Sequence, residues 1–132
     1  MVSVKWLHMG QWPCYVGFTR SEADFQQEMK RLKIKDIDFL ASDHACATTH
    51  RLEGEGTMVI IITLTSKKAT REQEAALIAH EAMHAVQYIK EEYNRNHDFG
   101  VENEAYLLQY IVQECLQEAW KTKRSRSSKP TP

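Results

Sequence analysis

Residues 70–93 read TREQEAALIAHEAMHAVQYIKEEY and carry a long helical pattern. Thr70 is followed three positions later by Gln73, which forms a capping box, a common start of an α-helix. Apolar residues then recur at helical spacing, so we expect a helix from Arg71 to about Tyr93. The polar segment 94–100 ends this pattern.

Two further helices are predicted on either side of this one. A second long helical pattern runs from Val101 to about Trp120. Nearer the N-terminus, Ser21 with Asp24 three residues later resembles a helix N-cap, and apolar residues follow at helical spacing. We therefore expect a shorter amphipathic helix over residues 21–33.

The strands are predicted from β-branched runs and turn residues. Thr48–Leu52 and Thr57–Leu64 flank a Glu-Gly-Glu-Gly turn, which predicts a hairpin whose second strand is the strongest of the chain. Residues 1–18 mix aromatic residues with Gly and Pro, which is typical of short strands broken by turns. Asp36–Leu40 is expected to form another short strand. Together these elements predict an α+β fold.

Length and composition indicate one folded domain. The chain has 132 residues, of which 42% are hydrophobic and 27% charged, so one core is expected. We assign residues 1–122 to a single domain and expect the basic, Ser- and Pro-rich segment 123–132 to be disordered. The three cysteines are far apart and form no CxxC pair, which favours a reducing compartment.

Charge and hydropathy exclude several classes of function. The formal net charge is −1, so the chain as a whole is not a polycation, and a nucleic-acid contact is expected at most from the basic tail. Its longest apolar run, Met58–Ile62, is far too short to span a membrane, and we find no signal peptide pattern. We therefore expect a cytoplasmic protein without a membrane segment.

The main candidate for chemistry is a HExxH motif inside the long helix. His80 and His84 lie about 40° apart on one helical face and one turn apart in height, so both imidazoles can bind one cation. Glu81 projects beside them, where its carboxylate can reach a water on the metal without being a ligand. The motif predicts a zinc site with Glu81 as general base.

A catalytic zinc site needs a third protein ligand and one position open for water. The candidates are Glu102, Glu104 and His97, all close enough in sequence to fold back. Glu102 is favoured because polar residues follow it on the same helical stripe and can orient its carboxylate. Glu104 shares its stripe with apolar residues and remains the alternative, followed by His97.

These residues resemble the zincin metallopeptidases, and within them the gluzincin group, whose third ligand is a glutamate on a following helix. In several zincin families this glutamate stands three positions before an alanine, which selects Glu102 before Ala105. In thermolysin-like enzymes it immediately precedes the alanine, which selects Glu104, but those enzymes carry an Asp where this chain has Leu108. Metzincins are disfavoured because Gln87 stands where their Gly is required.

A wider resemblance covers about half of the chain. The segments 47–50, 80–87 and 102–109 look like those of small metallopeptidase-like proteins encoded by phages and prophages. The resemblance implies a minimal zincin-like fold: a small sheet, one N-terminal helix, the HExxH helix and a glutamate helix. It also implies Zn²⁺ as cofactor, a peptide or protein substrate and the cytoplasm of a bacterial host.

The predicted reaction is peptide hydrolysis by a zinc-activated water. Tyr106 and His97 are the candidates for stabilising the oxyanion or binding substrate. The strand Thr57–Leu64 is a candidate for pairing with an extended substrate if it borders the cleft, and otherwise it is an ordinary core strand.

Two alternatives to this assignment stay open. His44, Cys46 and His50 form a weaker candidate metal site, because their spacing fits no common zinc finger. The alternative function is a non-catalytic zinc-containing protein that binds a peptide or takes part in phage assembly. The intact Glu81 favours catalysis, since a non-catalytic protein has no chemical need for this acid.

Overall fold

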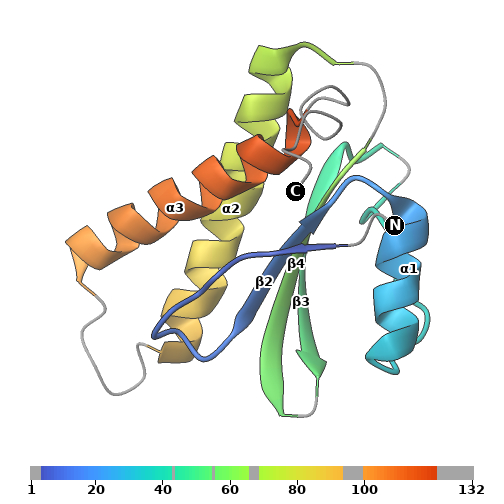
Figure 1. Ribbon diagram of the computed structural model, residues 1–132, viewed down its shortest axis with the longest axis horizontal. Helices are drawn as coiled ribbons and strands as arrows, with labels where there is room; N and C mark the ends of the chain where they lie inside the picture. The colour runs from blue at the N-terminus through green and yellow to red at the C-terminus, as the bar shows by residue number, and fades with distance from the viewer. Residues whose placement is uncertain (1–3, 43, 55, 66–68, 94–99, 122–132) are drawn as a thin grey trace, which may run out of the picture.

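The structure, a computed structural model, describes residues 4–42, 44–54, 56–65, 69–93 and 100–121. It confirms the α+β class: seven elements form a four-stranded sheet with helices on both faces (Figure 1). In chain order they are β1 (Lys5–Trp6), β2 (Tyr15–Thr19), α1 (Glu22–Arg31), β3 (Ala47–Gly54), β4 (Thr57–Leu64), α2 (Arg71–Tyr93) and α3 (Val101–Ala119).

The sheet is mixed and has the strand order β1-β2-β4-β3. β1 runs antiparallel to β2, β2 parallel to β4, and β4 antiparallel to β3. Helix α1 covers one face, whereas α2 and α3 lie over the other (Figure 1). Successive residues of β4 point into the two cores: Ile60 and Ile62 face the α2–α3 side, and Val59 and Ile61 face the α1 side. This explains why the run is apolar without alternation.

The hairpin prediction is confirmed, with β3 one residue longer at its start and two residues longer at its end. Because β4 lies between β2 and β3, both of its edges are already hydrogen-bonded. The condition under which Thr57–Leu64 would pair with a substrate is therefore not met. β4 is a core strand, and the edge strand on that side is β3.

Both predicted helix starts are confirmed by their caps. The Ser21 hydroxyl accepts from the Asp24 backbone N–H at 3.1 Å. At the start of α2, the Thr70 N–H donates to the Gln73 side chain at 2.8 Å and the Gln73 N–H donates to the Thr70 hydroxyl at 3.1 Å. Helix α1 ends at Arg31, two residues before the expected end, and Lys33 already has a positive φ of 61°.

The predicted strand at Asp36–Leu40 is wrong, since this segment is irregular. Asp36 has a φ of 63°, which no strand residue adopts. The Phe39 carbonyl accepts from the Thr63 hydroxyl at 2.7 Å, and the Phe39 ring is buried in the α1-side core. Side-chain anchoring therefore replaces strand pairing here. The basic tail 123–132 lies outside the described residues.

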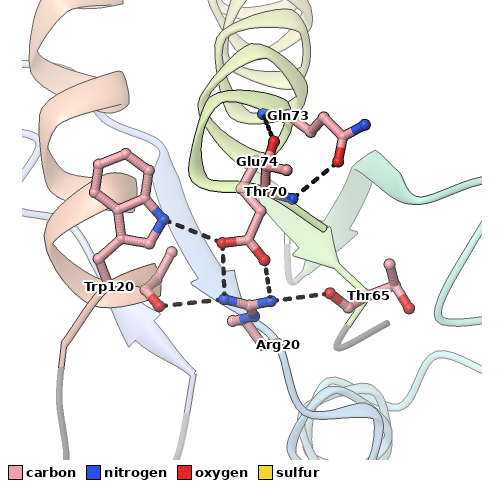
Figure 2. A network of polar contacts seen from close by, with 7 residues as sticks. Arg20, Thr65, Thr70, Gln73, Glu74 and Trp120 are labelled. Carbon is pink, nitrogen blue, oxygen red and sulfur yellow. Dashed lines mark hydrogen bonds and ion pairs between the residues drawn. The ribbon is translucent and has the colours of Figure 1, made fainter. Parts of the chain in front are cut away.

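One polar cluster, the Arg20 cluster, joins four elements at one end of the sheet (Figure 2). Arg20 follows β2, and its guanidinium donates to both oxygens of the buried Glu74 on α2, at 2.6 and 3.3 Å. It also donates to the carbonyls of Thr65, after β4, and of Ala119 in α3, each at 3.2 Å. The Trp120 indole N–H donates to Glu74 at 3.1 Å. The cluster thus fixes the first turn of α2 against the sheet and against α3.

Within the described ranges, no helix combines the length and the apolar character that crossing a membrane requires.

We expect Arg20→Ala to lower the free energy of unfolding by about 3 kcal/mol, because it leaves the buried Glu74 carboxylate without its cation. Arg31→Ala is the matched control. Arg31 pairs with Glu28 one turn earlier on α1, and its side chain is 62% exposed, so we expect the free energy of unfolding to fall by less than about 0.5 kcal/mol. Urea unfolding measures both. Equal effects would contradict the assignment of the Arg20 cluster as a stabilising junction.

Candidate metal centre

Helix α2 presents the HExxH motif beside a firmly packed face. Its buried side, which includes Ile78, Ala82 and Ile89, packs on the sheet and on α3. His80 lies on the exposed side and His84 is partly exposed. The apolar face therefore fixes the rotation of the helix, and this rotation leaves both imidazoles accessible from solvent.

The two imidazoles already have the separation that a shared metal requires. The Nε2 atoms of His80 and His84 lie 3.2 Å apart, and the ring centroids lie 4.8 Å apart. Two nitrogens bound to one tetrahedral zinc at about 2.0–2.1 Å are themselves about 3.3 Å apart. The separation of the two Nε2 atoms thus matches that of two ligands of one tetrahedral zinc.

Gln87 selects the tautomer of His84. His84 Nδ1 lies 3.1 Å from the Gln87 side-chain oxygen, one turn further along α2. Because this oxygen can only accept, Nδ1 carries the proton and Nε2 keeps its lone pair. An acceptor on the outer nitrogen of a histidine is the usual support of a metal-binding imidazole. Gln87 was not predicted in this role, although its i, i+3 spacing from His84 on a predicted helix is a sufficient signal.

Glu81 is buried, with 7% of its surface exposed, and it points towards β3. The Thr49 hydroxyl lies 2.7 Å from Glu81 Oε1 and 2.8 Å from the Glu81 backbone carbonyl. Thr49 is the only hydrogen-bond partner of this carboxylate within the described ranges. Nothing in the sequence indicates this contact, because it joins residues 32 positions apart.

A charged group follows Thr49 on the same face of β3. The Arg51 guanidinium donates to Glu91 at 2.9 Å and lies 5.3 Å from the centroid of the Tyr88 ring. Tyr88 stands one turn beyond His84 on α2. The edge strand β3 is therefore fastened to α2 within the motif, by Thr49 at Glu81, and beyond the motif, by Arg51 at Tyr88 and Glu91.

Among the described residues, the structure does not place a third ligand beside the histidines. Glu104 forms an ion pair with Lys90 at 3.2 Å, and Glu102 is exposed at the start of α3. His97 lies outside the described residues. Among the residues described, no three His, Cys, Asp or Glu side chains come together as a metal-binding group. The third ligand therefore stays a prediction.

The ion pair shows why Glu104 lies apart from the motif. Lys90 comes six residues after His84, which corresponds to about 120° around the helix and about 9 Å along it. The Glu104 carboxylate therefore meets a different side and a different height of α2 from those of His84.

Tyr106 and the second candidate metal site lie elsewhere. Tyr106 is 64% exposed and lines a pocket of about 260 Å³ with the loop around His8 and Trp12, and no residue of the HExxH motif belongs to its described lining.

The second candidate metal site is not formed, since His44, Cys46 and His50 do not come together as a cluster. His50 is buried on the α1 side, where its Nε2 lies 2.9 Å from the Phe39 carbonyl. Burial lowers the pKa of His50. The hydrogen bond to Phe39 and the charge of Glu81 raise this pKa and offset part of the decrease.

The buried cysteines are poor nucleophiles at neutral pH. Burial raises the pKa of Cys14 to about 11 and that of Cys115 to about 12, so both stay protonated. Cys46 is exposed.

Comparison of the chain with protein-family models, with curated proteins and with solved structures found no match.

We expect Gln87→Leu to weaken zinc binding about 10- to 100-fold, because it removes the acceptor that fixes the His84 tautomer. Gln27→Leu, the same change on the exposed surface of α1 across the sheet from α2, is the matched control and should leave zinc affinity unchanged. Competition with a chromophoric zinc chelator measures both. An unchanged affinity of the Gln87 variant would contradict the role assigned to this residue.

Proposed function

We propose that the protein is a zinc-dependent peptidase in which His80 and His84 hold the metal and Glu81 is the general base. The observation that carries this proposal is the 3.2 Å separation of the two Nε2 atoms, next to a buried carboxylate on the same helix. A tautomer fixed by Gln87 supports it further. The resemblance of the HExxH region to zincins supplies the reaction class.

Zinc bound by these residues would supply a Lewis acid and lower the pKa of water to about 7. The protein's own contribution is the proton transfer. The Glu81 carboxylate accepts a proton from the water that attacks the peptide carbonyl, and then donates this proton to the nitrogen of the leaving amine. Because Glu81 follows His80 by one residue, its carboxylate lies beside the proposed metal ligands and is not itself a ligand.

The edge strand β3 is the proposed site for the substrate backbone. It is the last strand of the described sheet on the side of α2, and Thr49 and Arg51 fasten it beside the motif. An extended peptide can add to such an edge by backbone hydrogen bonds. This assigns to β3 the role that the sequence analysis considered for Thr57–Leu64.

We further propose that the substrate is a host or phage protein in the bacterial cytoplasm. This rests on the resemblance of the segments around the motif to phage-encoded metallopeptidase-like proteins.

A second candidate function is a non-catalytic protein that binds a peptide or takes part in assembly. It is favoured by the ion pair between Glu104 and Lys90 and by the lack of a third ligand among the residues described. The buried Glu81 argues against it, because burial of a carboxylate with only a hydroxyl partner lowers stability.

We expect Glu81→Gln to reduce kcat about 10²- to 10⁴-fold while the protein keeps its zinc, because the amide cannot accept the proton. Cleavage of a fluorogenic peptide library and elemental analysis measure the two quantities. His80→Ala, in contrast, should lose both the metal and the activity. A Glu81→Gln variant with wild-type kcat would contradict the proposed mechanism.

The third ligand is tested by two glutamate variants. We expect Glu102→Ala to lose zinc affinity sharply and Glu104→Ala to lose little, because the Glu104 carboxylate is already paired with Lys90. Isothermal titration of the apoprotein with zinc measures the difference. The reverse order would assign the third ligand to Glu104, and wild-type affinity of both variants would exclude both glutamates.

A further inference from the structure

The surroundings of Glu81 differ from those of the other buried glutamate of α2. Glu74 is neutralised by the Arg20 guanidinium and also accepts from the Trp120 indole. The Glu81 carboxylate has no cationic partner within the described ranges, and its one hydrogen bond comes from the Thr49 hydroxyl. A carboxylate buried with a single neutral donor is costly, so this arrangement calls for a reason other than stability.

Thr49 itself is held rigidly. Its backbone pairs with Ile62 in the middle of the β3–β4 ladder. The next residue, His50, points to the opposite face of the sheet, where it contacts the Phe39 carbonyl and the Thr63 hydroxyl. A β-branched side chain on a fixed strand has few rotamers, whereas a glutamate side chain has several torsions to restrain. The rigid partner therefore determines where the flexible one lies.

We propose that Thr49 is the positioning residue that holds the Glu81 carboxylate in the orientation from which it accepts the proton. The hydroxyl proton is shared between Oε1, at 2.7 Å, and the Glu81 backbone carbonyl, at 2.8 Å. Thr49 thus holds Oε1 against β3 and leaves Oε2 without a hydrogen-bond partner within the described ranges. Because β3 is also the proposed substrate edge, one residue aligns the base with the strand that the peptide joins. This inference rests on the proposed peptidase function.

The first test compares two substitutions of Thr49. Thr49→Val keeps the shape but removes the hydroxyl, and should lower kcat about 10- to 100-fold with KM and zinc content unchanged. Thr49→Ser restores the hydroxyl and should recover most of kcat. Thr19→Val is the matched control, since the Thr19 hydroxyl on β2 accepts from the Ser21 N–H at 3.0 Å and lies outside the site. It should change stability but not kcat.

The second test needs no activity. In the metal-free protein, Thr49→Val and Glu81→Ala should shift the urea midpoint non-additively, because each removes the hydrogen bond between the Thr49 hydroxyl and the Glu81 carboxylate. Additive shifts would show that the two side chains do not interact and would overturn the proposal.

The outcomes separate this inference from the proposed function. An active wild type together with a Thr49→Val variant of equal kcat overturns the role of Thr49 and leaves the peptidase assignment in place. A wild type that holds one zinc but cleaves no peptide overturns the peptidase assignment and, with it, the catalytic role of Thr49. A loss in Thr49→Val that Thr49→Ser recovers, with the Thr19 control unchanged, supports the inference.

Discussion

The ion pair between Arg20 and Glu74 is the contact on which the arrangement of the other elements depends. It joins the end of β2 to the first turn of α2, and the same guanidinium binds carbonyls that follow β4 and end α3. Since Glu74 precedes His80 by six residues, fixing its position also fixes the height of the motif, about 9 Å further along the helix. The apolar face of α2 then sets the rotation, so that both histidines point outward.

Against this fixed helix, the motif combines features that stability alone does not explain. Two imidazoles stand with their Nε2 atoms 3.2 Å apart on an accessible surface, and a carboxylate between them in sequence is buried against a threonine. Helix propensity explains neither arrangement. Both are explained if His80 and His84 bind a metal and Glu81 handles a proton beside it, and the edge strand β3 then supplies the other wall of the site.

Local signals predicted much of the fold. The capping box at Thr70, the N-cap at Ser21 and the hairpin turn before Thr57 each depend on a few neighbouring residues, and each is confirmed. Long-range pairing was not predictable in this way: the parallel pairing of β2 with β4 brings together strands some 40 residues apart. Asp36–Leu40 was misassigned because Phe39 is held by tertiary contacts with Thr63, which no local pattern reports.

The residues of the candidate site differ in the same way: those close together in sequence were predictable, and those brought together by long-range packing were not. His80, Glu81 and His84 lie within two turns of one helix, so spacing alone predicted their proximity, and Gln87 was within reach of the same reasoning. Thr49 was not, because its contact with Glu81 depends on how the edge strand packs on α2. The choice between Glu102 and Glu104 depends on the packing of α3 on α2, and there the structure pairs Glu104 with Lys90.

The central claim is that His80 and His84 bind zinc together, and X-ray absorption at the zinc edge tests it most directly. With one equivalent of zinc, we expect two imidazole ligands at about 2.0–2.1 Å and oxygen atoms completing a tetrahedral shell. The imidazole scattering should disappear in His80→Ala. A spectrum of hydrated zinc, or one with sulfur ligands, would contradict the claim.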